Sequence, residues 1–264
     1  MSDIHLYVIT YRCMTQPRDW DAATYQRLSA PLTAMGSDVL DRLLLAGDET
    51  VLDAGCGTGG VTRLLMERLP RGHVIAVDGS ASMVERARRE LPPGADVRQA
   101  DLLELELDEP VDAILSTATF HWILDHARLF ARLHAALAPG GRLVAQCGGH
   151  GNVAAVKQAG LDVAGEPPYA EHLEGWATDW QFATPQDTEA RLRAAGFTAV
   201  WCWLSRVDVD PGDPVSYLRA ICLGSFLERL PAELHERFVA AALERLEAPL
   251  TIHYVRLNIL ARRA

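Results

Sequence analysis

One acid and three glycines stand together in this sequence. Asp53 lies two residues before Gly55, and Gly57 and Gly59 follow at single-residue spacing. Because glycine has no Cβ, the backbone there can turn tightly and come close to a bound molecule. The apolar residues before Asp53 are typical of a buried strand, and a helical pattern begins near Gly60. A strand, a glycine turn and a helix predict the first half of a nucleotide-type pocket.

The charge of Asp53 discriminates between two kinds of ligand for that pocket. The same glycines also fit the fingerprint of dinucleotide-binding turns, which bring a pyrophosphate to this place. A carboxylate beside the turn would repel a pyrophosphate, whereas S-adenosylmethionine (SAM) carries a sulfonium and an ammonium group that attract an anion. Asp53 therefore favours SAM over NAD, and a dehydrogenase is the alternative class of enzyme.

Two further acids follow predicted strands. Asp78 comes after the apolar residues 74–77, where a carboxylate can accept hydrogen bonds from the ribose hydroxyls of either cofactor. Asp101 follows a predicted strand at 95–100, and its carboxylate can receive the adenine amino group while Leu102 packs on the ring. Acids at strand ends also cap helices, so a purely structural role is the alternative for each.

Taken together, these residues resemble the class I SAM-dependent methyltransferases across residues 50–147. The matching segments are DAGCGTG (53–59), VDGS (77–80), QADLLEL (99–105), VDAILSTATFHW (111–122) and LAPGGRLVAQ (137–146). The resemblance implies SAM as the cofactor and S-adenosylhomocysteine as its product. The residues that it implies at the SAM site are Asp53, Gly55 and Gly57 at the methionine end, Asp78 at the ribose, Gly79 and Met83 beside the adenine, Asp101 and Leu102 at the adenine edge, Thr117 on the sulfonium side, and Tyr25 in a covering lid.

The residues after the fourth predicted strand point to the methyl acceptor. Residues 117–126 resemble the His-Trp or Gln-Trp segment of trans-aconitate methyltransferases and related small-molecule carboxyl methyltransferases. The resemblance implies His121 and Trp122 as candidate catalytic residues, with His121 orienting an acidic acceptor or taking a proton from it. Recognition of a carboxylate also needs a cation, and the candidates are Arg206, Arg219 and Arg256.

The function expected from these residues is methyl transfer from SAM to a small molecule, with oxygen as the favoured acceptor atom and a carboxylate as one candidate group. Two alternatives stay open. One is C- or N-methylation of a natural product with His121 as the base, and the other is a protein that binds SAM without turnover. A carboxylate has no proton to lose at neutral pH, so the pH dependence of the rate distinguishes it from acceptors that need a base.

Strands and helices alternate five times within residues 50–147, which predicts a doubly wound α/β fold with a parallel sheet. Helices are expected near 60–69, 80–91 and 125–138. The family resemblance implies a Rossmann-like sheet of order 3-2-1-4-5-7-6 with N-terminal helices and a helical cap built from insertions. The expected segments are a disordered extension (1–13), N-terminal helices and the SAM-binding core (14–147), a cap insertion (148–184), a core helix and the sixth strand (185–212), a helical cap insertion (213–247) and the last core strand (248–264).

Composition narrows the choice of partners. The 264 residues carry a formal net charge of −10, which argues against nucleic acid as the main substrate because phosphate binding needs clustered Lys and Arg. Five scattered cysteines favour reduced thiols in a cytoplasmic protein. We find no apolar run of membrane-spanning length, no secretion-signal pattern and no metal-ligand spacing. We therefore expect a monomer or homodimer that acts on small molecules, away from membranes and nucleic acids.

Overall fold

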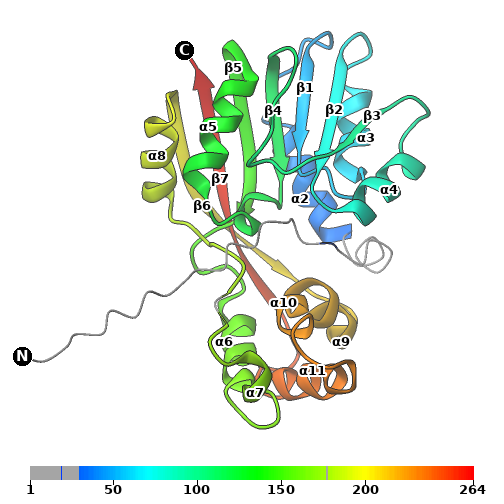
Figure 1. Ribbon diagram of the computed structural model, residues 1–264, viewed down its shortest axis with the longest axis vertical. Coiled ribbons are helices and arrows are strands. Elements are labelled where there is room, and N and C mark those ends of the chain that lie inside the picture. The colour runs from blue at the N-terminus through cyan, green and yellow to red at the C-terminus, as the bar shows by residue number, and fades with distance from the viewer. Residues whose placement is uncertain (1–18, 20–29, 177) are drawn as a thin grey trace, which may run out of the picture.

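The computed structural model describes residue 19, residues 30–176 and residues 178–264, and its centre is a seven-stranded sheet (Figure 1). The strand order β3-β2-β1-β4-β5-β7-β6 confirms the expected order. Neighbours from β3 to β5 pair in parallel, and β7 runs antiparallel to both β5 and β6. The strands are β1 (Thr50–Ala54), β2 (His73–Asp78), β3 (Asp96–Gln99), β4 (Val111–Thr117), β5 (Leu137–Gly148), β6 (Phe197–Val209) and β7 (Ile252–Arg263).

Helices cover both faces of this sheet. On one face lie α2 (Ala30–Leu40), α3 (Gly60–Glu67) and α4 (Ala81–Glu90), and on the other lie α5 (His126–Ala136) and α8 (Pro185–Ala194) (Figure 1). The alternation along β1 shows the two layers, because Val51 packs with α2 and α3 whereas Leu52 packs with α5. The three helices expected within 60–138 are thus present. In the part of the chain expected to hold N-terminal helices, α2 lies among the described residues.

Local signals in the sequence explain where several helices begin. The Ser80 side chain accepts a hydrogen bond from the Met83 N–H at the start of α4, and Asp125 accepts one from the Arg128 N–H at the start of α5. Thr184 caps α8 by accepting from the Asp187 N–H, with a proline at the first helical position. These caps fix the ends of the helices that flank the carboxyl edge of the sheet.

Beyond the carboxyl ends of the parallel strands lies a second group of helices, which we call the cap (Figure 1). Residues 206–209 of β6 and 252–255 of β7 pair past the end of β5 and carry the chain into it. Phe226 and Phe238 are fully buried at its centre and pack against aromatic neighbours. The cap contains α6 (Ala154–Ala164), α7 (Ala170–Leu173), α9 (Pro214–Tyr217), the π-helical turn η2 (Leu218–Cys222), α10 (Gly224–Leu227), η3 (Ala232–Leu234) and α11 (His235–Leu243).

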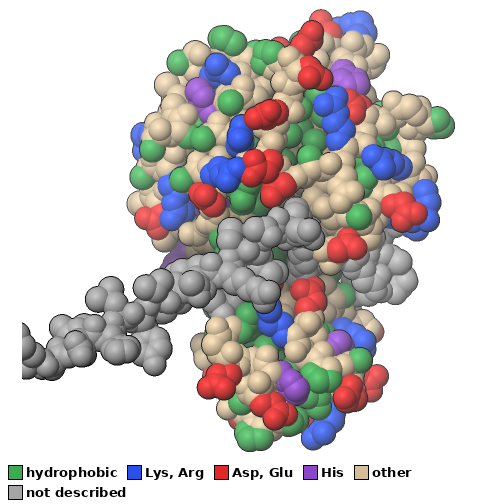
Figure 2. Space-filling view, in the orientation of Figure 1, with side chains coloured by type: hydrophobic (Ala, Val, Ile, Leu, Met, Phe, Trp, Pro, Cys, Tyr) green, Lys and Arg blue, Asp and Glu red, His purple; other side chains and the backbone are tan. Residues whose placement is uncertain are grey.

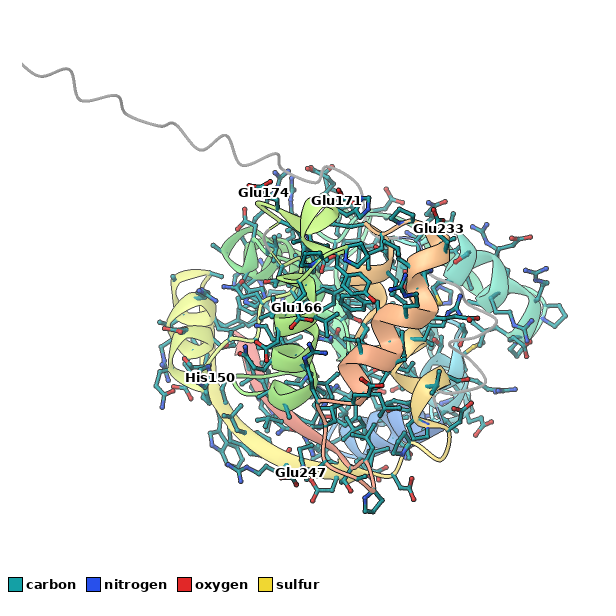
Figure 3. All side chains as sticks on the ribbon, turned by 90° about the horizontal axis from the view of Figure 1, so that it is seen from below. His150, Glu166, Glu171, Glu174, Glu233 and Glu247 are labelled. Atoms are coloured by element: carbon teal, nitrogen blue, oxygen red, sulfur yellow. The ribbon has the colours of Figure 1, made fainter. Side chains whose placement is uncertain are left out.

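Acidic side chains are prominent on the outer surface of the cap. Figure 3 shows this surface from below, and the exposed residues that it labels there include Glu166, Glu171, Glu174, Glu233 and Glu247. Glu166 forms an ion pair of 2.7 Å with Arg245 of the same cap. In the described part of the chain, every helix is too short or too polar to cross a lipid bilayer.

Candidate active site

The three glycines form a tight turn between β1 and α3, as their spacing predicts. Gly55, Gly57 and Gly59 all have positive φ angles, of 86°, 55° and 84°, which L-amino acids with a Cβ rarely adopt. A Cβ on Gly55 would come within 2.0 Å of the Thr119 hydroxyl, so this glycine lets the loop after β4 pack on the turn. A Cβ on Gly57 would meet nothing within 4 Å. The turn is therefore closed on the Gly55 side and open at Gly57.

Asp53 is buried beside this turn with half of its carboxylate unpaired. Its side chain is only 1 % exposed, and Oδ2 accepts a hydrogen bond of 2.7 Å from the Thr62 hydroxyl. Among the described residues, Oδ1 has no hydrogen-bond partner. Burial raises the pKa of Asp53 to about 6; the bond from Thr62 opposes this and the charge of Asp78 adds to it. A buried carboxylate oxygen without a partner fits a ligand that brings positive charge, as SAM does.

Asp78 at the end of β2 joins the glycine turn to the next helix. One carboxylate oxygen accepts from the Gly57 N–H and the other from the Ser80 N–H, both at 2.9 Å. Burial raises the pKa of Asp78, while these two hydrogen bonds lower it. The neighbouring Gly79 carbonyl accepts a bond of 3.4 Å from the Gln99 side chain, and the Met83 side chain is 4 % exposed in α4. The acid is thus held at the carboxyl edge of the sheet, where the resemblance places the ribose.

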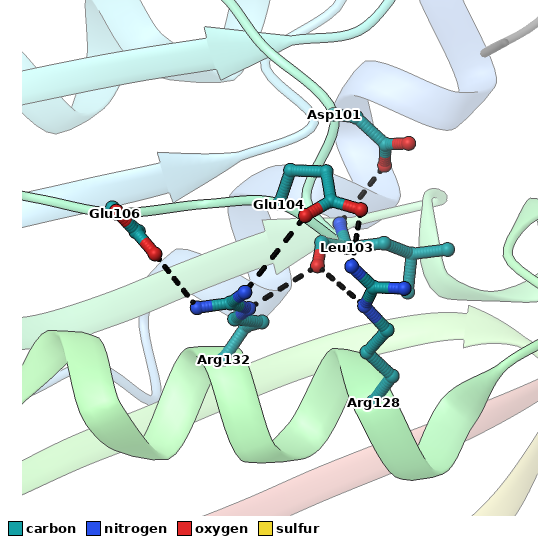
Figure 4. A network of polar contacts seen from close by, with 6 residues as sticks. All are labelled: Asp101, Leu103, Glu104, Glu106, Arg128 and Arg132. Atoms are coloured by element: carbon teal, nitrogen blue, oxygen red, sulfur yellow. Dashed lines mark hydrogen bonds and ion pairs between the residues drawn. The ribbon is translucent and has the colours of Figure 1, made fainter. Parts of the chain in front are cut away.

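The segment after β3 is pinned against α5. Asp101 Oδ1 accepts from the Leu103 N–H at 2.9 Å, and the Leu102 side chain is buried in the core between the sheet and α5. Figure 4 shows how two arginines of α5 hold this segment through the Leu103 carbonyl, with Nε to oxygen distances of 3.0 and 3.2 Å. The same arginines also form ion pairs with acidic residues of the segment. The participants are Arg128, Arg132, Glu104 and Glu106.

Thr117 is the last residue of β4, and the loop that follows it contacts the glycine turn. The next residue, Ala118, has a positive φ of 57° and donates its N–H to the Gln146 carbonyl at 2.7 Å. Thr119 Oγ1 then lies 3.2 Å from the Gly55 carbonyl and 3.0 Å from the Thr117 carbonyl. A left-handed conformation outside glycine is uncommon and is often found at functional sites. The loop after β4 is therefore locked onto the turn that holds Gly55.

His121 is a buried, uncharged histidine in the short helix η1 (Phe120–Trp122). Its side chain is 7 % exposed, and Nδ1 accepts a hydrogen bond of 3.2 Å from the Gly148 N–H. Because a backbone N–H can only donate, the ring proton of neutral His121 is on Nε2. Burial lowers the pKa of His121 well below its usual value, and the positive charge of Arg256 lowers it further. The ring lies 4.9 Å from the Trp122 ring, centroid to centroid.

Of the three candidate arginines, Arg256 is the one that the fold buries. Arg206 and Arg219 are exposed, whereas Arg256 on β7 is only 3 % exposed. Its Nε donates to Gln146 Oε1 on β5 at 3.3 Å, and the guanidinium lies 5.8 Å from the centre of the Tyr254 ring. A permanent positive charge is thus held beside the neutral ring of His121.

A buried amide network that the sequence reasoning missed supports this arginine. Gln146 Nε2 donates to Asn258 Oδ1 at 2.8 Å, and Asn258 Nδ2 donates to Ser205 Oγ at 2.9 Å. Arg42, which follows α2, also donates to Asn258 Oδ1. The available signal was one amide residue inside each of two otherwise apolar runs, 143–147 and 257–260, since buried amides need partners. Tyr25 and the extension at 1–13 lie outside the described residues.

Comparison with known proteins gives two kinds of match. A family model described as a methyltransferase domain matches residues 51–141. The trans-aconitate 2-methyltransferase of Methylobacterium nodulans is 35 % identical over 256 residues, which cover 93 % of this chain and 98 % of that protein. The enzyme of the same name from Acidovorax sp. strain JS42 is 31 % identical and covers 93 % of this chain and 99 % of that protein.

Solved structures share the fold at much lower sequence identity. The YcgJ protein of Bacillus subtilis aligns with a TM-score of 0.60 and 16 % identity over 87 % of this chain and 98 % of its own. The Haemonchus contortus phosphoethanolamine N-methyltransferase 2, crystallised with SAM, aligns with a TM-score of 0.58 and 18 % identity over 92 % of this chain and 56 % of its own.

Proposed function

We propose that this chain methylates a carboxylate oxygen of a small organic acid. The premise is that the chain belongs to the family of SAM-dependent methyltransferases that includes the trans-aconitate 2-methyltransferases. Membership of this family shows methyl transfer from SAM to a small molecule and so confirms the expected cofactor and class of enzyme. The carboxylate acceptor is the proposal. It is supported by the activity for which the relatives are named and by the positive charge of Arg256 beside His121.

The proposed SAM site begins at the glycine turn. SAM, when bound, supplies a methyl group on a positively charged sulfur. We assign the unpaired Oδ1 of Asp53 to the positive methionine end of this ligand and the open space at Gly57 to its close approach. The remaining assignments stay as the resemblance implied them. They are Gly55 at the methionine end, Asp78 at the ribose, Gly79, Met83, Asp101 and Leu102 around the adenine, Thr117 on the sulfonium side and Tyr25 in the lid.

The proton position on the neutral His121 ring favours a carboxylate as the acceptor. A phenol, an alcohol or a carbon acid needs a base, but Nδ1 of His121 accepts from Gly148 and Nε2 holds the ring proton. The same ring can donate from Nε2 to an anionic oxygen, and Arg256 beside it stabilises negative charge. We infer that His121 and Trp122 position the acceptor and that Arg256 binds its reactive carboxylate. A carboxylate already carries the lone pair that attacks, so no proton has to move.

An acceptor panel with SAM labelled in the methyl group tests this proposal. We expect label transfer to organic acids such as trans-aconitate, with a product that mild alkali hydrolyses to methanol, because only a methyl ester behaves in this way. The rate should be independent of pH between about 7 and 9, since neither acceptor nor His121 loses a proton there. Alkali-stable product, or a rate that falls on the acidic side of this range, would contradict carboxylate methylation.

The His121→Gln variant separates a positioning role from a base. Glutamine can still accept from the Gly148 N–H with its side-chain oxygen and donate from its amide, but it cannot take up a proton. We expect kcat to fall by less than about tenfold, whereas loss of a general base costs roughly a hundredfold or more. Trp122→Phe tests the neighbouring residue by the same measurement of kcat.

Several coarser features belong to the same proposal. We propose that the chain works in the cytoplasm as a monomer or homodimer, without nucleic acid as a partner, and that residues 148–184 and 213–247 form the cap over the acceptor. On the face drawn in Figure 2, positive and negative side chains are interspersed, with no large basic patch in view. The net charge of −10 points in the same direction. Size-exclusion chromatography with light scattering measures the oligomeric state directly.

A further inference from the structure

Unpaired buried polar atoms gather in one short stretch of the cap. Among the described residues, buried side-chain atoms without a hydrogen-bond partner include Trp176 Nε1, Asp179 Oδ1, Trp180 Nε1 and Gln181 Oε1. Such a group costs about 1–3 kcal/mol when it stays unpaired, so four within residues 176–181 call for an explanation. A ligand that supplies the missing partners is one explanation that has a physical test.

This stretch borders the ring of His121. The Gln181 N–H donates to the His121 carbonyl at 2.7 Å, and the Phe182 ring centre lies 5.7 Å from that of His121. The Trp180 ring in turn lies 6.3 Å from Phe182. Trp180 is 8 % exposed, so its unpaired N–H is enclosed by the protein. The aromatic residues lead directly from the proposed reaction centre into the cap.

The only lysine in the sequence lies on these same rings. Lys157 belongs to α6, is half-buried, and has its Nζ 5.4 Å from the ring centre of Trp180 and 5.7 Å from that of Phe182. Within the described part of the chain, no carboxylate forms an ion pair with it. An ammonium group over two ring faces leaves its N–H donors available to an anion.

We propose that Lys157 and the Trp180 indole N–H bind a second carboxylate of the acceptor, one that is not methylated, and so select polycarboxylic acids over monocarboxylic acids. This inference rests on the proposed function, in which the reactive carboxylate lies at Arg256. Of the four unpaired atoms, the Trp180 N–H is the one assigned to this anion. Asp179 Oδ1 and Gln181 Oε1 can only accept, and they are not assigned to it, nor is the Trp176 N–H.

Kinetics with matched acids test the site. For Lys157→Gln, we expect the KM for trans-aconitate to rise about ten- to a hundredfold, because a hydrogen-bonded charge is removed. The KM for crotonate, an unsaturated monocarboxylic acid, should change less than about twofold, and kcat should change little for both. Trp180→Phe keeps an aromatic ring at this position, removes the N–H and should shift the same KM in the same direction. Equal effects on both acids, or none, would overturn the inference.

Arg229→Gln is the control variant in the cap. Arg229 also lies over an indole ring, 5.6 Å from the centre of Trp176, but it is exposed. Its loss should leave both KM values unchanged. A KM for trans-aconitate that rises as much in Arg229→Gln as in Lys157→Gln would show a general effect of cap charge and contradict a specific site.

A spectroscopic test uses the single lysine without mutating it. Reductive methylation with ¹³C-formaldehyde gives one lysine side-chain signal, which we expect to move on titration with trans-aconitate and not with crotonate. If the signal moves in this way while no acid becomes esterified, the proposed function is wrong and the polyacid site stands. If esters form and the signal is unmoved by trans-aconitate, the site is wrong and the proposed function stands.

Discussion

Asp53 combines a cost to folding with a proposed role in SAM binding. Its pKa of about 6 in the folded protein lies above the value of 3.8 for an unperturbed aspartate. The folded chain therefore holds more protons than the unfolded chain between about pH 4 and 6, and the free energy of unfolding falls as pH rises through this range. Above it, the penalty is about 3 kcal/mol. A cationic ligand beside the unpaired oxygen would offset this penalty.

The Asp53→Asn variant tests both sides of that statement. We expect the ligand-free variant to melt at a higher temperature than the parent at pH 7, because the buried charge is removed. The same variant should bind SAM at least about tenfold more weakly by calorimetry. In the parent protein, SAM affinity should fall as pH drops below about 6, where Asp53 becomes neutral, and the variant should lack this dependence. Undiminished SAM binding by Asp53→Asn would contradict the role assigned to this acid.

At the scale of elements, β7 decides where the buried cation lies. Because this strand runs antiparallel between β5 and β6, Arg256 pairs in register with Gly148, and Asn258 with Gln146. Side chains two residues apart share a face of the sheet, so Arg256 and Asn258 both reach Gln146. The arginine is thereby oriented by two strands instead of by a flexible loop.

The Gln146→Met variant tests whether this orientation matters. Methionine fills a similar volume but gives no hydrogen bond to Arg256 or Asn258. We expect the KM for the acid to rise about tenfold while the Kd for SAM stays within about twofold, because the network reaches the acceptor side only. Arg206→Met on the exposed edge strand β6 is the control and should leave both unchanged. A parallel loss of SAM binding would show instead that Gln146 supports the cofactor side.

At the scale of the whole molecule, the cap has its own aromatic core. Phe226 is fully buried, with its ring centre 4.8 Å from Trp176, 5.9 Å from Trp180 and 5.4 Å from Phe238. The residues proposed for the SAM site lie instead along the edge of the sheet. The regions that we propose for the acceptor and for SAM are thus supported by different packing clusters.

The Phe226→Ala variant should therefore separate acceptor binding from SAM binding. Removing a buried phenylalanine costs about 3–5 kcal/mol, and the loss falls on the cap. We expect a lower melting temperature and a raised KM for the acid, with the Kd for SAM nearly unchanged. Val215→Ala, at a half-exposed position of the cap, is the control. Weakened SAM binding of the same size in Phe226→Ala would show that the cap and the cofactor site are coupled.

The sequence by itself determined the class of fold and the cofactor. The pattern that carries this information is local, because Asp53 and the glycines lie within a few residues of one another and Asp78 directly follows an apolar run. The expected strand order, SAM and methyl transfer to a small molecule are confirmed. The individual roles of the site residues, including His121, stay predictions.

Only the tertiary structure showed which of the candidate arginines is buried beside His121. Arg206, Arg219 and Arg256 look alike in the sequence, and burial of one of them depends on β7 returning between β5 and β6 from more than a hundred residues away. The position of Lys157 over the Trp180 and Phe182 rings likewise depends on how a helix packs against a distant stretch of the cap. Local patterns carry no information on such long-range contacts, because burial and hydrogen-bond partners are set by packing of the complete chain.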